Sequence, residues 1–362
     1  MTMLFMKKKY QLERFFVTWL MILFMILTDA FTAFAQVKQA TFLVNGISCD
    51  LEQGILKVEF VTPDVVRVQY TGENTFIGNG TDVCLPRAVD NPVRWVYTPN
   101  PDCYLLKSDS LIVRVDLSTA SITYLDKEGG LLLQEDQNIP RISEKRVTKQ
   151  VIYDEHSKHI EKTADGDKEI KKVLRYDTIG HTWKYRINFK WQPLEALYGW
   201  GAHMEDYMNL RGKELYLCQH NLKAMVPVLN STAGYGLLFD AGCAMMFKDN
   251  SEGSFVELEA AKQIDYYFMK GKTMDAVVAN YRLLTGNSPM MPLYLFGYIQ
   301  SKERYVSSDD LINTLKEYRQ RQIPIDMIVQ DWNYWPEGQW GNMSMNPKFY
   351  PDKRKLADEI HS

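Results

Sequence analysis

The chain has 362 residues, enough for two or three domains, and its 46% hydrophobic and 24% charged residues exclude a wholly disordered or fibrous protein. The formal net charge is −3. Because there is no surplus of basic residues to hold phosphate backbones, the composition argues against nucleic acid as a partner. Aromatic residues make up 12% of the chain. That content suits both ligand stacking and a large β core, so it favours neither.

The N-terminus has the pattern of a secretory signal peptide. Basic residues including Lys7 and Arg14 precede an apolar run over residues 15–27, and Ala33 and Ala35 then form a small-residue cleavage pattern. The apolar run is short for a membrane span, which makes a membrane anchor the less favoured alternative. We expect residues 1–35 to be removed after Ala35 and the mature protein to be secreted or periplasmic, with no membrane association.

Cysteine and histidine usage gives no sign of a metal or redox centre. The five cysteines include no C-x-x-C pair. One or two disulfides are compatible with an oxidising compartment, and their pairing stays open. His156 and His159 lie in a stretch rich in Lys and Glu, which fits a solvated segment better than a metal site. The pair Gly199-x-Gly201 lacks the third glycine of a dinucleotide fingerprint. We therefore expect no cofactor.

The first part of the mature chain is patterned as strands. Apolar and polar residues alternate over residues 56–60, 66–70 and 183–190, as in half-buried antiparallel strands. Residues 141–175 are dense in charged residues and predict a long exposed hairpin or loop. Short alternating strands separated by turns indicate a β-sandwich or a β-barrel.

The period changes near residue 274. Thr273 is placed to cap a helix whose apolar positions end near Leu284, and Gly286 follows it. Residues 287–292 contain two prolines and mark a domain boundary. We therefore divide the chain into a signal peptide (1–35), a β-sandwich domain (36–288) and a further domain (289–362).

The last segment is patterned as α/β. Residues 295–301 and 325–331 predict two buried strands, Ser307 begins a helix between them, and a second helix starts near Asp352. Strand, helix, strand, helix is the opening of a (β/α)₈ barrel, which takes about 250 residues when complete. Since so little chain follows residue 289, we expect a truncated barrel; an unusual small α/β domain is the alternative.

Three ordered motifs carry a resemblance to a known family. Residues 295–305 (LFGYIQSKERY), 318–326 (YRQRQIPID) and 329–335 (VQDWNYW) resemble the first two barrel strands of glycoside hydrolase family 31. Residues 197–201 (LYGWG) resemble its Tyr-Gly-x-Gly signature, and residues 346–352 (NPKFYPD) resemble the segment before its second barrel helix. The family includes α-glucosidases and α-xylosidases.

The resemblance implies a fold and an activity. The expected fold is an N-terminal, galactose-mutarotase-like antiparallel β-sandwich followed by the first two βα units of the barrel. The expected activity is that of an exported retaining α-glycosidase acting on α-linked oligosaccharides with two carboxyl groups. In this family both are aspartates on later barrel strands, so we expect the nucleophile and the acid/base beyond Ser362 and the present chain to be inactive.

The resemblance also implies part of a sugar-binding site. The matching family aspartate binds sugar hydroxyls, which assigns that role to Asp331. Trp332 and Trp335 follow it, and Tyr298 comes from the first strand; we expect these rings to stack on pyranose faces. A strand-end cap is the alternative role for Asp331, and core packing for the aromatic residues. His203, Glu205 and Asp206 fit a polar surface turn better than a contribution to the pocket.

Other functions stay open. A non-catalytic carbohydrate-binding protein is the alternative to the glycosidase, and transglycosylases and lyases also occur in the family. The run Gln300-Ser301-Lys302 favours xylosidase-like members, whereas Glu303 stands where several α-glucosidases carry an aromatic residue. The oligomeric state is not predicted.

Overall fold

The computed structural model describes residues 36–362 apart from 79–82, 86–91, 164–165 and 340. The proposed signal peptide lies outside the described residues. The chain divides into two units, one formed by residues up to Thr148 with Ile179–Asn287, the other by Lys149–Thr178 with Ser288–Ser362. Each unit is described on its own.

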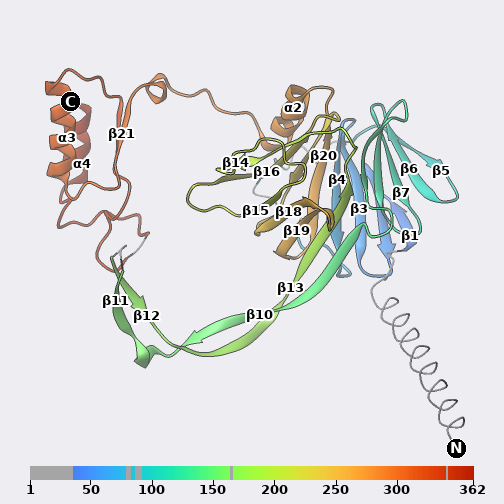
Figure 1. Ribbon diagram of the computed structural model, residues 1–362, viewed down its shortest axis with the longest axis horizontal. Helices are drawn as coiled ribbons and strands as arrows, with labels where there is room; N and C mark the ends of the chain where they lie inside the picture. Colours follow the sequence, from blue (N-terminus) through green and yellow to red (C-terminus); the bar gives the residue numbers. More distant parts are fainter. Residues whose placement is uncertain (1–35, 79–82, 86–91, 164–165, 340) are drawn as a thin grey trace, which may run out of the picture. The chain divides into compact units, whose positions relative to one another are not determined.

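Two antiparallel sheets make up the first unit (Figure 1). The first sheet runs in the order β1 (Val37–Phe42), β2 (Gly46–Leu51), β3 (Ile55–Thr62), β4 (Val65–Thr71), β20 (Ile264–Lys270), β17 (Tyr235–Phe239), β16 (Ala224–Ser231), β14 (Leu197–Ala202). The second runs in the order β15 (Glu214–Leu217), β18 (Met245–Asn250), β19 (Gly253–Ala261), β13 (Val173–Lys190), β9 (Leu131–Glu135), β8 (Ile122–Asp126), β7 (Leu111–Asp116), β6 (Cys103–Ser108), β5 (Trp95–Pro99).

The two sheets pack face to face over one hydrophobic core. Tyr124 on β8 stacks on Phe268 on β20 with ring centroids 3.9 Å apart and planes 4° from parallel. The Tyr124 and Tyr266 hydroxyls also lie 3.0 Å apart between the sheets. The predicted antiparallel β-sandwich is therefore confirmed.

The polar face of β4 differs from the sequence prediction. Residues 66–70 predict a half-buried strand, but all of β4 is buried. Arg67 donates to both carboxylate oxygens of Asp265 on β20, at 2.9 and 2.6 Å, and the Gln69 amide donates to Asp265 at 2.8 Å. Arg67 and Asp265 are 198 residues apart in the chain, and their ion pair compensates the burial of polar side chains that the alternating pattern predicts to be exposed to solvent.

The charged segment forms the predicted long hairpin. The strand β10 (Arg141–Tyr153) pairs with β13, and most of its side chains are exposed or half-buried (Figure 1). Between them lie a short 3₁₀ turn (Glu155–Ser157) and a two-stranded ribbon of β11 (His159–Thr163) and β12 (Gly166–Ile170). His156 and His159 belong to this turn and ribbon.

The helix α2 (Met274–Thr285) packs on the first sheet. The Thr273 side chain accepts a hydrogen bond from the Ala276 amide, and Gly286 follows the helix with φ 90°. Both end signals in the sequence are therefore confirmed. Val277 and Leu284 are buried against the sheet, whereas Met274 and Val278 are exposed.

The C-terminal stretch of the second unit, from Ser288 on, contains two parallel strands and two helices. A 3₁₀ turn (Leu293–Phe296) precedes β21 (Ile299–Ser301), α3 (Ser308–Gln320), β22 (Met327–Val329) and α4 (Lys353–His361). The predicted helix starts are confirmed, since the side chains of Ser307 and Asp352 accept the capping hydrogen bonds. The predicted strands are longer than the observed ones: Pro292 begins the 3₁₀ turn, and Gly297 closes it through a bond to the Tyr294 carbonyl. The order βαβα and the parallel pairing confirm the two βα units.

In the part of the chain that the structure describes, the five cysteines form no disulfide. Burial raises the pKa of the Cys49 thiol to about 12, which makes that side chain a structural one. Among the described residues, no helix combines the length and the apolar content needed to cross a bilayer.

Candidate functional site

The two parallel strands bring their following residues to one edge. Gln300 pairs with Ile328 and Ser301 with Val329. The carboxyl ends of β21 and β22 therefore meet, and this is the end at which (β/α)₈ barrels carry their active sites. Glu303 and Arg304 follow the first strand, and Gln330, Asp331 and Trp332 follow the second.

Asp331 lies two residues past the end of β22 with an exposed side chain. Among the described residues, its carboxylate has no hydrogen-bond or ion-pair partner. The backbone N–H of the next residue, Trp332, donates to the carbonyl of Glu303 at 3.1 Å. Asp331 is thus an acceptor-only group held on a loop whose backbone is tied to the neighbouring strand.

Two of the predicted aromatic residues lie together beside Asp331. The rings of Trp332 and Trp335 meet edge to face, with centroids 6.4 Å apart and planes at 88°. The Arg304 guanidinium lies over the Trp332 ring, 5.2 Å from its centroid. Both indoles are half-buried, so each keeps part of its surface in contact with solvent. Tyr334, between them in the chain, meets the Trp335 ring with centroids 5.4 Å apart and also packs on the hydrophobic cluster under the helices.

Tyr298 lies at the other end of the strands. Its carbonyl accepts hydrogen bonds from the backbone amides of Asp326 and of Met327, the first residue of β22. Its hydroxyl donates to the Gln300 side chain at 2.6 Å and lies 3.0 Å from the Tyr318 hydroxyl on α3. Tyr298 raises the pKa of Tyr318 through that contact. The structure does not bring Tyr298 together with Asp331, and its contact with sugar stays a prediction.

The structure adds Gln330, which the sequence interpretation missed. Both polar atoms of its side chain are buried, and neither has a hydrogen-bond partner among the described residues. Buried amides are nearly always paired, so the Gln330 side chain is an unsatisfied polar group next in sequence to Asp331. The sequence signal that could have identified Gln330 is its position as a polar residue directly after the apolar run of residues 327–329.

The residues after the Tyr-Gly-x-Gly signature belong to the first unit. The Lys223 ammonium lies 2.8 Å from the Glu205 carboxylate and lowers its pKa. His203 Nδ1 lies 3.9 Å from Glu205, and its imidazole is largely buried with no hydrogen bond among the described residues. Asp206 is exposed and has a positive φ of 49°. The turn thus has a buried imidazole beneath a polar surface.

The signature itself has a structural role. Trp200 is fully buried between Phe239 and Phe247, at 5.7 and 5.9 Å between ring centroids. Gly199 and Gly201 flank it at a β-bulge, with φ of 128° and 91°. A Cβ on Gly201 would lie 1.9 Å from the Ala224 carbonyl oxygen, so only glycine fits. In the described residues, no group of three or more His, Cys, Asp or Glu side chains is arranged to hold a metal.

Family models match both units. The glycosyl hydrolase 31 N-terminal galactose mutarotase-like domain matches residues 55–247, more than half of the chain. The chain belongs to glycoside hydrolase family 31. The TIM-barrel domain of the same family matches residues 288–362, which include β21, β22 and Asp331.

Characterised relatives and solved structures agree with the family. An α-xylosidase from Saccharolobus solfataricus is 28% identical over 315 residues, which cover 84% of this chain and 38% of the relative. A dextranase from Flavobacterium johnsoniae has the same fold with TM-score 0.69 at 19% identity, over 91% of this chain and 37% of that one. An α-xylosidase from a soil metagenome, complexed with xylose, gives TM-score 0.68 at 21% identity, over 90% of this chain and 45% of that one. The family 31 chain thus spans less than half the length of these proteins.

Proposed function

We propose that this chain is the sugar-binding front part of an exported retaining α-glycosidase acting on α-xylosides. The observation that carries the proposal is the exposed Asp331 carboxylate beyond the carboxyl end of β22, beside Trp332 and Trp335. A carboxylate accepts two hydroxyl hydrogen bonds at once and so fixes the orientation of a sugar ring. The neighbouring indoles offer apolar surface to the C–H face of that ring.

The proposal assigns the chemical step to residues after Ser362. A retaining glycosidase needs a nucleophile and an acid/base carboxyl about 5–5.5 Å apart. Asp331 is given the binding role because nothing among the described residues pairs it with a second carboxyl or a proton donor. Gln330 lies next to it as a further hydrogen-bonding group.

An α-xyloside is the favoured substrate and an α-glucoside the alternative. The run Gln300-Ser301-Lys302 and the similarity to α-xylosidases over most of the chain support this choice. Export is the remaining part of the proposal, supported by the basic start, the short apolar run and Ala33-x-Ala35. N-terminal sequencing of the secreted protein should begin at Gln36.

Hydrolysis of aryl α-xyloside and aryl α-glucoside tests the function. The protein extended past Ser362 should cleave the xyloside with the higher kcat/KM, and NMR should detect α-xylose as the first product. The 362-residue chain alone should release no aryl group. Turnover by the 362-residue chain, or β-xylose as the first product, would contradict the proposal.

A further inference from the structure

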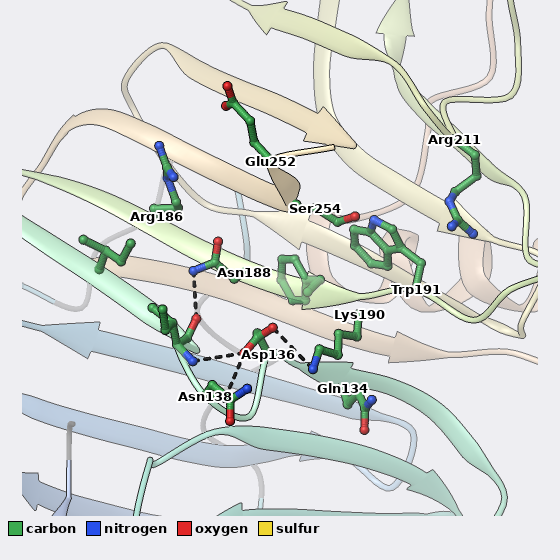
Figure 2. A pocket seen from close by; sticks show the side chains of 14 residues that line it. Gln134, Asp136, Asn138, Arg186, Asn188, Lys190, Trp191, Arg211, Glu252 and Ser254 are labelled. Atoms are coloured by element: carbon green, nitrogen blue, oxygen red, sulfur yellow. Dashed lines mark hydrogen bonds and ion pairs between the residues drawn. The ribbon is translucent and has the colours of Figure 1, made fainter. Parts of the chain in front are cut away.

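A groove of about 660 Å³ lies on the first unit, among residues that the proposed function does not use. It is built by β9, the turn that follows it, β13 and the start of β19, which are neighbours in the second sheet. Its size falls within the ~300–1,000 Å³ typical of small-molecule sites. Figure 2 shows its labelled side chains, which include Gln134, Asn138 and Asn188.

The basic side chains of the groove are each matched by a carboxylate. Lys190 Nζ lies 3.4 Å from Asp136 (Figure 2), Arg211 Nε lies 2.9 Å from Asp249, and an Arg186 nitrogen lies 2.9 Å from Glu257. A phosphate or sulfate site keeps cations available for its ligand. Because these cations are already neutralised, the groove favours an uncharged ligand.

The remaining polar groups are mainly amides. The side chains of Gln134 and Asn138 have no hydrogen-bond partner among the described residues. The Asn188 amide donates to the Ile139 carbonyl at 2.8 Å, which holds the turn against β13 (Figure 2). A primary amide donates and accepts hydrogen bonds at once, as does a sugar hydroxyl. Free amides on a central strand and the turn that follows it therefore suit a polyhydroxylated ligand.

The groove also has apolar surface. Ile139 and Ile142 are 47% and 44% exposed and supply it, while the buried, stacked rings of Phe189 and Trp191, 5.0 Å apart, support the floor from below. Pyranose rings present C–H faces to such surfaces while their hydroxyls reach the surrounding polar groups. The groove thus offers apolar surface for the C–H faces of a sugar and polar groups for its hydroxyls.

We propose that this groove is a second carbohydrate-binding site, which holds a neutral oligosaccharide chain apart from the site at Asp331. The inference rests on the proposed function for its choice of ligand, an α-xylosylated glucan. Its role is to keep the polymer on the enzyme, while the residues at the barrel strands bind the sugar to be cleaved.

Affinity electrophoresis of the full chain in gels containing xyloglucan, with dextran as the comparison polymer, tests the groove. The variant Gln134→Ala/Asn138→Ala should bind xyloglucan at least 5-fold more weakly than the wild type. Both altered side chains lack partners, so the unfolding transition should not move. A matched control is Gln53→Ala/Asn74→Ala, two exposed amide residues of the same unit outside the groove, which should bind as the wild type does.

The outcomes separate this inference from the proposed function. A wild-type chain that xyloglucan does not retard, or a groove variant that is retarded as much as the wild type, would overturn the second site. In the protein extended past Ser362, the groove variant should cleave aryl α-xyloside at the wild-type rate. If the extended protein with the wild-type groove failed to cleave aryl α-xyloside while its xyloglucan binding stayed intact, the proposed function would be overturned and the groove left in place.

Discussion

The backbone N–H of Trp332 donates a hydrogen bond to the carbonyl of Glu303 at 3.1 Å, which joins the loops after β21 and β22. Asp331 immediately precedes this bond, so its backbone is fixed although its side chain is exposed. A carboxylate that orients a sugar should be accessible and should have a fixed backbone, because little conformational entropy is then lost when the sugar binds.

Replacing Asp331 should affect turnover far more than stability. A charged hydrogen bond to a sugar hydroxyl contributes about 1.5–3 kcal/mol, so Asp331→Ala should lower kcat/KM at least ~10-fold in the protein extended past Ser362. The melting temperature should hardly change, because the side chain has no partner to lose among the described residues. Kinetics and thermal unfolding of one purified variant measure both quantities.

A second exposed aspartate of the same unit supplies the control. Asp358→Ala on α4 should leave both kcat/KM and the melting temperature close to wild type. If Asp331→Ala instead lowered the melting temperature strongly while kcat/KM stayed normal, Asp331 would be a structural cap.

Local signals in the sequence predicted the element ends better than the element lengths. Thr273, Ser307 and Asp352 each form the capping hydrogen bond that their position predicts, because capping depends on a few adjacent residues. The first barrel strand is shorter than the apolar run at residues 295–301, because Pro292 and Gly297 direct the first residues into a 3₁₀ turn. The second strand extends only over Met327–Val329, the residues that pair with this short first strand. The burial of β4 also depended on a residue distant in the sequence, since Asp265 on β20 accepts hydrogen bonds from the Arg67 and Gln69 side chains of β4.

The candidate site was predictable only in part. Asp331, Trp332 and Trp335 follow one strand, so one motif identifies all three. Tyr298 shares a motif with β21 but lies before the strand instead of after it, and strand direction separates it from Asp331. No sequence motif points to Gln330. It is noticed only in the structure, where its side-chain amide is buried without a hydrogen-bond partner among the described residues.

The β-bulge at the signature predicts a steep difference between two glycine substitutions. Gly201→Ala should destabilise the fold by more than ~2 kcal/mol, for two reasons. The added Cβ would lie 1.9 Å from the Ala224 carbonyl oxygen, and alanine would have to adopt the φ of 91° that glycine has there. Gly212 has φ 72° with nothing within 4 Å of the added Cβ. Gly212→Ala should therefore cost only about 1 kcal/mol, for the backbone alone. Urea unfolding compares the two, and equal losses would contradict the steric argument.

Asp249 should make the stability of the β-sandwich depend on acid pH. Burial raises the pKa of Asp249, but hydrogen bonds from Ser254, the Gly212 amide and Arg211 outweigh it, so the pKa lies below its usual 3.8. A lowered native pKa gives stability that is present above the unfolded value and lost as pH falls through the native value. Asp249→Asn should therefore cost about 1.5–3 kcal/mol at pH 7.

The difference between wild type and Asp249→Asn should shrink steadily as the pH falls below 3.8, the ordinary value for an aspartate. Urea unfolding at pH 7, 4 and 2.5 measures it. The exposed Asp109 gives the control, since Asp109→Asn should leave the unfolding free energy unchanged at each pH. If the difference in unfolding free energy stayed constant down to pH 2.5, Asp249 would stabilise the fold by its packing and not by its charge.

The base of the long hairpin is fixed by a buried ion pair between Glu135 on β9 and Arg141, the first residue of β10. Glu135 also accepts hydrogen bonds from the Ile122 amide at 2.9 Å and the Tyr266 hydroxyl at 3.0 Å, and Arg141 donates to the Ala120 carbonyl at 3.0 Å. Arg141→Met would leave the carboxylate buried without its counter-charge, which costs about 3–5 kcal/mol.

Removing both charges should restore most of that loss. In Arg141→Met/Glu135→Gln, the amide oxygen can accept from the Ile122 N–H while its NH2 donates to the Tyr266 hydroxyl, which can donate to Tyr124. No buried charge remains, so the double variant should be more stable than Arg141→Met alone by about 2 kcal/mol or more. The exposed pair Arg146 and Glu144, 3.1 Å apart on β10, is the matched control. Arg146→Met should hardly change the unfolding free energy, and adding Glu144→Gln should change it little further, because solvent already screens both charges. Equal unfolding free energies for Arg141→Met and its double variant would mean that Arg141 anchors the hairpin by packing and its bond to Ala120, not by neutralising Glu135.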